Sequence, residues 1–160
     1  MNETIPEWAA ALGRVPSGLF ILTVRHQGQE TGMLASWVMQ AGFEPPTLTV
    51  AVKKGRYVAQ WLEQKAPFVL NIVPEGQNRL VSHFARGFRP HEKPFENLKI
   101  HRTSEGVPVL EDCLGYLECQ VLTHTDSPDH RIFVAQITGG NLLTPEGKPW
   151  VHVRKNGLQY

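Results

Sequence analysis

The chain has few cysteines and no pattern of metal ligands. Its 160 residues include only two cysteines, Cys113 and Cys119. They form no Cys-x-x-Cys pair and no Cys and His cluster at zinc-ligand spacing, so the sequence predicts no metal site. The pattern places both on one strand, on the same face but about 20 Å apart, which is too far for a disulfide. Two reduced thiols are typical of a cytoplasmic protein.

The chain also lacks a charge imbalance and a long apolar run, and we expect no secretory leader. Its 16 basic and 15 acidic residues leave a net charge of +1, so no overall field attracts nucleic acid or an acidic membrane. No apolar run approaches the roughly 18 residues that a membrane-spanning helix needs, and no basic segment followed by an apolar one opens the chain. The sequence therefore predicts a cytoplasmic protein without nucleic-acid or membrane partners, in which any anion site is local.

The phosphate-binding pattern Gly-x-Gly-x-x-Gly and a regular alternation of strands and helices are both absent, which disfavours a doubly wound parallel sheet. Apolar residues make up 41% of the chain and charged residues 19%, which is ordinary for one globular domain covering 1–160. Alternating and apolar runs predict strands at 19–25, 33–40, 47–52, 68–73, 114–123, 131–137 and 150–153. We therefore expect a mostly β fold, a closed antiparallel barrel over about 18–153.

A few short helices are expected to cover this barrel. One is predicted at about 4–12, capped by Thr4, and two more have helical periodicity at 57–62 and 77–86. The segment 87–96 has two prolines and no period, which is typical of a functional or partner-facing loop.

The segment Thr31–Tyr57, TGMLASWVMQAGFEPPTLTVAVKKGRY, holds the strongest functional signal. Small residues and accessible backbone amides over 31–37 suit close approach of a planar polar ring. The cluster Lys53-Lys54-Gly55-Arg56, at the start of a predicted helix, suits a phosphate. Taken alone, the first part is more typical of half-buried strand packing, and a basic turn is often simply solvated. Together they fit a ligand with a flat heteroaromatic head and a phosphate tail, such as flavin mononucleotide (FMN).

Histidines and nucleophiles give a weaker signal. His130 follows Asp129 in a turn, where surface histidines are common. No Ser-His-Asp or Cys-His arrangement is evident, so covalent catalysis is not predicted.

Several segments together carry a family resemblance, among them GLFILTV, GMLASWVMQAGFEPP, EGQNRLVSHFA, GYLECQV and DHRIFVAQI. In this order and spacing the chain resembles the flavin reductase-like family, whose fold is the FMN-binding split barrel. It is most similar to the flavoredoxin-like and diflavin-protein branch, over nearly the whole chain.

The resemblance implies a homodimer with one flavin in each subunit, and it implies roles for particular residues. Those expected to line the flavin ring are Met33, Leu34, Ala35, Ser36 and Trp37, with backbone amides and Ser36 serving its polar edge. Gln40 is expected at the ribityl chain. The residues expected at the phosphate are Lys53, Lys54, Arg56 and Tyr57, with Phe84 and Arg86 closing the pocket. His130 is the expected catalytic residue, beside the flavin or nicotinamide face.

Two departures from the family pattern remove hydroxyl groups. Leu34 stands where many members have Thr, and Gly42 where many have Ser. The polar contacts to the ring are therefore expected to come from backbone amides.

The resemblance implies an NAD(P)H:flavin oxidoreductase, in which the flavin accepts hydride and the protein binds and orients it. FMN is the expected cofactor, with FAD as the alternative, and NAD(P)H is the co-substrate. Two other functions stay open: an electron-transfer flavoprotein reduced by a protein partner, and a flavin-binding module without turnover. Pyridoxine-phosphate oxidases share a related barrel, but their substrate-phosphate pattern is not matched.

Overall fold

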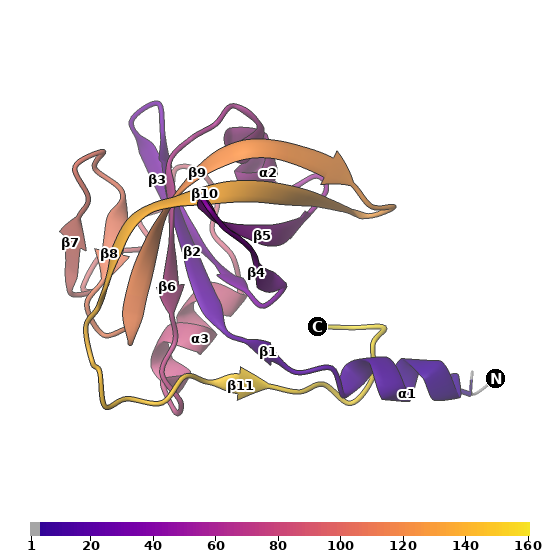
Figure 1. Ribbon diagram of the computed structural model, residues 1–160. Coiled ribbons are helices and arrows are strands. Elements are labelled where there is room, and N and C mark those ends of the chain that lie inside the picture. Colours follow the sequence, from indigo (N-terminus) through magenta and orange to yellow (C-terminus); the bar gives the residue numbers. More distant parts are fainter. Residues whose placement is uncertain (1–3) are drawn as a thin grey trace.

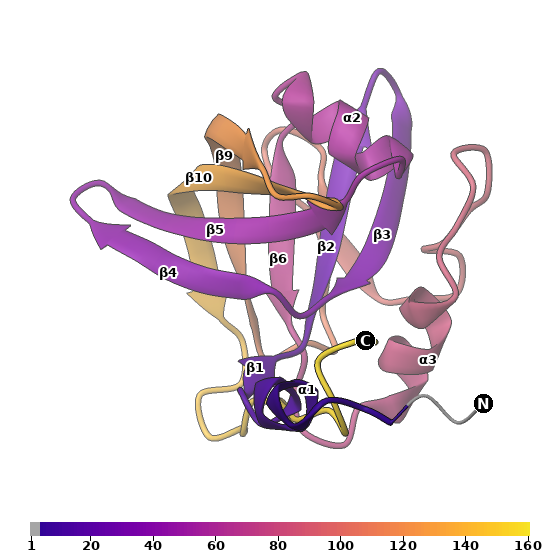
Figure 2. The ribbon, with the colours of Figure 1, turned by 90° about the vertical axis from the view of Figure 1, so that its right-hand side faces the viewer.

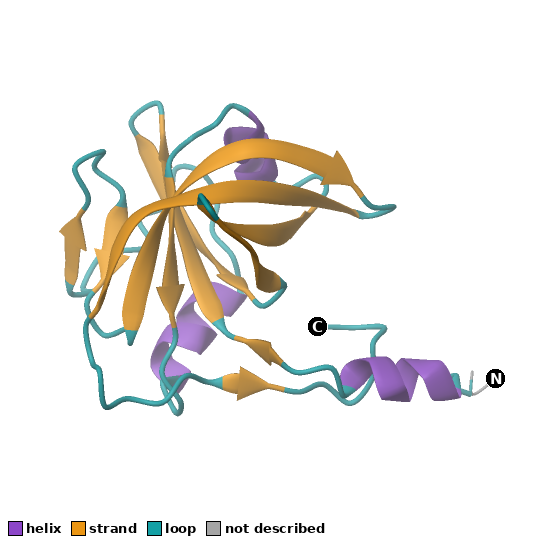
Figure 3. Cartoon of the chain, viewed as in Figure 1, coloured by secondary structure: helices purple, strands orange, loops and turns teal. Residues whose placement is uncertain are grey.

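The computed structural model describes residues 4–160 and is built on one antiparallel sheet of seven strands (Figure 1). The strands lie in the order β3 (Gln29–Ala35), β2 (Phe20–His26), β6 (Phe68–Ile72), β9 (Gly115–Asp126), β10 (His130–Leu142), β5 (Pro46–Lys53) and β4 (Val38–Phe43). Three short helices accompany them: α1 (Glu7–Gly13), α2 (Tyr57–Glu63) and α3 (Asn78–Ala85) (Figure 3). The mostly β class with short helices is thus confirmed.

The sheet curls so that its two edge strands, β3 and β4, approach at one end (Figure 2). These strands are consecutive in the chain, and only Ser36 and Trp37 separate them. In the part of the chain that the structure describes, no ladder joins β4 to β3, so the predicted closure of the barrel is not confirmed. The prediction of a single strand over 33–40 is wrong. The chain leaves one edge of the sheet at Ser36 and joins the opposite edge as β4.

The side chains of each strand point alternately to the two faces of the sheet, and apolar residues on both faces are covered by other elements. On β5, Leu48, Val50 and Val52 are buried and alternate with partly exposed residues. They pack inside the curl with residues from the other strands and with Val58, Trp61 and Leu62 of α2. Helix α3 packs on the outer face, where Leu80 and Phe84 join Ile21 of β2 in a second apolar cluster.

Two short strand pairs form separate two-stranded sheets beside the seven-stranded one. Strand β7 (Ile100–Arg102) pairs with β8 (Pro108–Leu110). A buried amide attaches this hairpin to the sheet: Asn71 donates to the Ile21 carbonyl at 2.9 Å and accepts from the Leu110 amide at 2.9 Å. Because each of these groups is buried, the bonds replace those to water and fix the hairpin in place.

The second pair joins the C-terminal part of the chain to the segment that precedes β2. Strand β1 (Ser17–Gly18) pairs with β11 (Val151–His152). Beyond β11 the tail runs along α1, with the Arg154 amide donating to the Gly13 carbonyl at 3.0 Å and the Gly157 amide to the Ala9 carbonyl at 2.6 Å. Helix α1 thereby holds the tail in position as it turns toward the region between α3 and the sheet (Figure 2).

Two local predictions need correction. The N-cap of α1 is Pro6, without a side-chain cap bond, so Thr4 does not cap the helix. Cys113 lies in the turn before β9 and only Cys119 lies in the strand, so the two do not share a strand. Both are free and buried, and burial raises the pKa of each thiol to about 12. None of the helices within residues 4–160 has the length and apolar character to cross a bilayer.

Candidate functional site

A cavity lies where the β3–β4 link, the end of β5, helix α3 and the C-terminal tail meet. Its volume is about 380 Å³. Eight of the residues that the sequence singled out line it: Met33, Leu34, Ala35, Ser36, Trp37, Lys53, Arg56 and Phe84. The segment 31–57 thus contributes both its small-residue part and its basic part to one space.

The break between β3 and β4 shapes one side of this cavity. The Trp37 carbonyl accepts a bond from the Ala51 amide at 3.0 Å, which fixes the link against β5. Ser36 and Trp37 have therefore left the ladder between strands while their backbone stays anchored. A link of this kind offers amide and hydroxyl groups to a ligand without disturbing a strand pair.

An aromatic wall, the Phe84 ring of α3, forms part of the cavity lining. The Phe84 ring is fully buried and packs on Gly32 of β3, where a Cβ atom would come within 2.6 Å of the ring. Ala35, Ala51 and Ala85 add small side chains to the lining. This part of the cavity is therefore apolar and suits the face of a planar ring.

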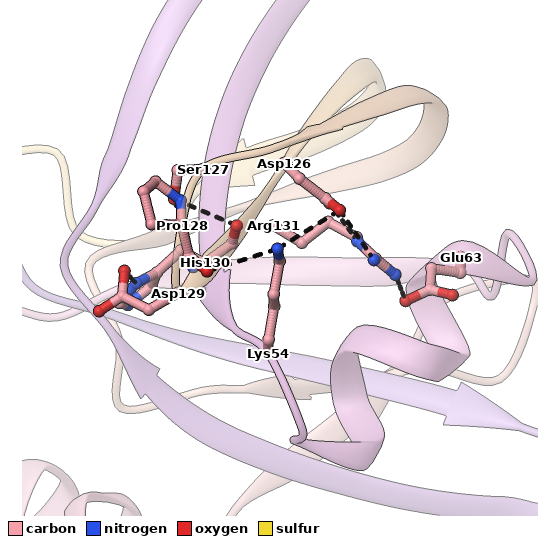
Figure 4. Close-up of polar contacts among 8 residues, drawn as sticks. All are labelled: Lys54, Glu63, Asp126, Ser127, Pro128, Asp129, His130 and Arg131. Atoms are coloured by element: carbon pink, nitrogen blue, oxygen red, sulfur yellow. Dashed lines mark hydrogen bonds and ion pairs between the residues drawn. The ribbon is translucent and has the colours of Figure 1, made fainter.

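The basic cluster divides between two locations. Lys53 and Arg56 line the cavity, and within residues 4–160 neither has a carboxylate within 4.0 Å. Lys54 points elsewhere, toward Asp126 at 3.4 Å and the Pro128 carbonyl at 3.5 Å (Figure 4). The cavity thus holds two positive charges available to an anion, and Lys54 is already paired.

The group that holds Lys54 also includes Arg131 and Glu63 (Figure 4). Arg131 donates to Asp126 through Nε at 2.6 Å and Nη2 at 3.2 Å, and it contacts Glu63 on its other side. The Arg131 bonds, followed by the charges of Arg131 and Lys54, lower the pKa of Asp126 to about 2.

This lowered pKa predicts how acid affects stability. Ionised Asp126 stabilises the fold above its unfolded-state pKa near 4, and the contribution disappears as the pH falls through about 2. Asp126→Asn should lower the urea midpoint at pH 6, and its difference from wild type should shrink between pH 4 and pH 2. Asp112→Asn, at an exposed carboxylate without an ion pair in the described part of the chain, is the matched control. A difference that stays constant from pH 6 to pH 2 would contradict the assignment.

His130 lies beside the cavity in a chain of contacts. Its Nδ1 is 2.8 Å from Oδ1 of Asp129, and its Nε2 contacts the Tyr160 hydroxyl. The imidazole also packs on Trp37 with ring centroids 4.6 Å apart, and Tyr160 packs on the same indole at 5.1 Å. His130 is 5% exposed and is not among the lining residues, whereas Tyr160 is.

Three other predicted residues lie outside the cavity lining. Gln40 is exposed on β4 and donates to the Gly42 carbonyl. The Tyr57 hydroxyl bonds to Thr31 at 2.9 Å and to the Phe88 carbonyl at 2.5 Å, which ties the loop after α3 to the sheet. The Arg86 guanidinium lies over the Phe88 ring, 4.2 Å from its centroid.

Seven lining residues were not predicted: Leu19, Ala51, Val81, Ala85, Trp150, His152 and Tyr160. Val81 and Ala85 follow from the position of α3, since they lie one turn apart on the face that carries Phe84. Trp150, His152 and Tyr160 have no local signal. They reach the cavity because β11 pairs with β1 and because α1 holds the tail.

Comparison with known protein families shows to which family the chain belongs. The family model described as "Flavin reductase like domain" matches residues 12–157. The chain belongs to the flavin reductase-like family. Its resemblance to the diflavin-protein branch is confirmed as well: it is 42% identical over 151 residues to diflavin flavoprotein A 1 of Synechocystis sp. and 39% identical to putative diflavin flavoprotein A 6 of Nostoc sp.. Each match covers 94% of this chain and 26% of the relative, so the chain spans about a quarter of their length.

Solved structures named as flavin reductases or as an NADH:FAD oxidoreductase share the fold. The Streptomyces globisporus NADH:FAD oxidoreductase SgcE6 superposes with a TM-score of 0.83 at 23% identity, covering 90% of this chain and 85% of that one. The flavin reductase PheA2 gives a TM-score of 0.75 at 23% identity, over 90% of each chain. At this identity the likeness concerns the fold.

Proposed function

We propose that this protein is a flavoprotein oxidoreductase that binds FMN in the cavity between the β3–β4 link, α3 and the tail. One observation carries the proposal: Lys53 and Arg56, two cations without an acidic partner among residues 4–160, share a cavity with an apolar, aromatic wall. These lining residues fit FMN, because the apolar wall suits its planar ring and the two cations suit its phosphate. FAD stays the alternative, since it has the same ring and inner phosphate.

In this proposal each part of the cavity has its own task. Backbone amides of the β3–β4 link and the Ser36 hydroxyl bond the polar edge of the ring, while Phe84 and the alanines pack against its face. Lys53 and Arg56 hold the phosphate, and Trp37 covers the side near His130. When bound, the flavin supplies the site that accepts hydride or electrons. The protein's own contribution is orientation, exclusion of water and the charge around the ring.

NAD(P)H is the proposed electron donor. The fold neighbours named as flavin reductases and as an NADH:FAD oxidoreductase support it. The alternative, an electron-transfer flavoprotein reduced by a protein partner, is favoured by the relatives named as diflavin flavoproteins. Both functions need the flavin in the same place and differ in what approaches it.

The proposed assembly is a homodimer. Strand β4 is an edge of the sheet and exposes Met39 at 68% and Phe43 at 87%. An edge strand with exposed apolar side chains is normally covered in the native assembly. Sedimentation velocity would test this, and a protein that stays monomeric at micromolar concentration would contradict it.

The first experiment on function is the visible spectrum of the purified protein, with and without added FMN, followed by anaerobic NADH and then NADPH. Bound flavin that bleaches within seconds supports the reductase and identifies the nucleotide. Flavin bands that persist favour the partner-reduced electron carrier. A colourless protein that does not bind added FMN would overturn the proposal.

A further inference from the structure

Both ring nitrogens of His130 have a side-chain partner. Nδ1 is 2.8 Å from the Asp129 carboxylate, and Nε2 contacts the Tyr160 hydroxyl. The bond from His130, the largest cause, lowers the pKa of Asp129, so this carboxylate is ionised at neutral pH and can only accept. The proton of a neutral imidazole therefore lies on Nδ1, and Nε2 accepts a bond from Tyr160. The three groups form one directed chain, from phenol to imidazole to carboxylate.

Tyr160 is the member of this chain that faces the cavity. Its side chain lines the space and packs on Trp37. Burial is the main reason why its pKa is raised, while Arg56 and Arg154 act in the opposite direction and Asp129 in the same one. The phenol is therefore protonated at neutral pH. Asp129, at the far end, is 76% exposed at its side chain and is in contact with solvent.

The backbone holds Tyr160 in this position from the other side of the molecule. Two amides of the tail bond to carbonyls of α1, and Arg154 donates to the Gln159 carbonyl at 2.9 Å. The Arg154 guanidinium also lies 5.7 Å from the centroid of Trp37. The phenol is thus fixed against both Trp37 and His130 by contacts that do not depend on a ligand.

We propose that the Tyr160 phenol is the proton-exchanging group of the cavity, and that His130 and Asp129 are positioning residues that act through it. The inference rests on the proposed function. Hydride from NAD(P)H brings both electrons with their hydrogen, so that step needs no protein proton. Passing two electrons singly to one-electron acceptors releases one N–H proton from the reduced ring, and this proton needs a path out of the cavity.

The chain of three residues provides that path. The Tyr160 oxygen accepts the proton released by the ring while the phenol's own proton moves to Nε2 of His130. The imidazolium that forms is stabilised by the Asp129 carboxylate and loses its Nδ1 proton to water at that exposed carboxylate, which leaves the neutral ring protonated on Nε2. A shift of this proton from Nε2 to Nδ1 restores the starting tautomer before the next turnover. The phenol returns to its starting state, and the two electrons have gone to the one-electron acceptors. Tyr160 thus serves the transfer of electrons outward rather than the uptake of hydride.

The first test uses the protein without flavin. In Tyr160→Phe the ring stays and only the hydroxyl is lost, so the side-chain ¹⁵N resonances of His130 should shift, with those of His124 unchanged. Tyr116→Phe is the matched control, because Tyr116 packs in a separate cluster with Val107 and Val109. Unchanged His130 resonances in Tyr160→Phe would overturn the proposal, because they would show that the phenol does not bond Nε2.

The second test follows the flavin-loaded protein by stopped flow. Oxidation of the reduced protein by ferricyanide should slow by about 100-fold in Tyr160→Phe and lose its solvent deuterium isotope effect. Reduction by hydride should slow much less. The double variant Tyr160→Phe/His130→Gln should be no slower than the single one, since both substitutions interrupt one path.

These readouts separate the inference from the proposed function. Failure of the wild type to bind flavin overturns the proposed function and the relay with it. Normal flavin binding with an unchanged ferricyanide rate in Tyr160→Phe overturns the relay alone. Equal slowing of both half-reactions also overturns it, because loss of packing on Trp37 would then explain the effect.

Discussion

Replacing Arg56 by alanine is expected to weaken FMN binding by about 10- to 100-fold. Arg56 lines the cavity and has no carboxylate partner in the described part of the chain. Its bond to a phosphate would be charge-assisted on both sides, and loss of such a bond costs about 1.5–3 kcal/mol. Fluorescence quenching of FMN on titration with the apoprotein measures this directly.

Two controls make the result specific to the phosphate. Lys54→Ala removes a neighbouring cation that is occupied by Asp126, so FMN affinity should change by less than about threefold. Riboflavin, which has no phosphate, should bind Arg56→Ala and wild type alike. Equal losses for FMN and riboflavin would mean that Arg56 supports the ring site, and equal losses in both variants would remove the distinction between the two cations.

Truncation of Phe84 is expected to have the largest effect on stability. Phe84→Ala should lower the free energy of unfolding by about 3–5 kcal/mol, because a fully buried ring is lost from the cluster that joins α3 to the sheet. The ring contacts Phe88 and Phe95 at centroid distances of 5.8 and 6.0 Å. Urea unfolding followed by tryptophan fluorescence gives the value.

The matched control is Leu122→Ala, since Leu122 is 44% exposed on β9, away from the proposed dimer strand β4, and should change the free energy of unfolding by less than about 0.5 kcal/mol. A cost below about 1 kcal/mol for Phe84→Ala would mean that α3 does not depend on this ring. Because the same ring forms a wall of the cavity, FMN affinity should fall in parallel, and riboflavin affinity should fall with it.

Much of the fold follows from short-range patterns in the sequence. Alternating Leu48, Val50 and Val52 predicted β5, and the helical period of 57–62 predicted α2. In both elements the spacing of the apolar residues indicates which face is buried. The apolar run at 68–73 predicted β6 in the same way.

The break at Ser36 and Trp37 could not be predicted in this way. Residues 33–40 are as consistent with one strand as with two, because each half keeps ordinary strand composition. The break exists because the curl of the sheet separates the partners available to β3 and β4: β3 pairs with β2, and β4 with β5. Only the pairing of distant strands decides where the chain leaves the edge.

The candidate site was likewise predictable from the sequence only in part. The sequence by itself determined that small residues, an aromatic and cations occur within 31–57, which fixed the class of ligand that the segment suits. The tertiary structure decided which of them face one cavity. Lys54 is a neighbour of Lys53 in the chain but lies in the turn after β5, where its amide bonds to the Asp129 carbonyl at 3.0 Å and its side chain reaches Asp126. Tyr160 reaches His130 only because α1 and β1 hold the tail across the sheet, a contact between residues 30 apart that no local pattern encodes.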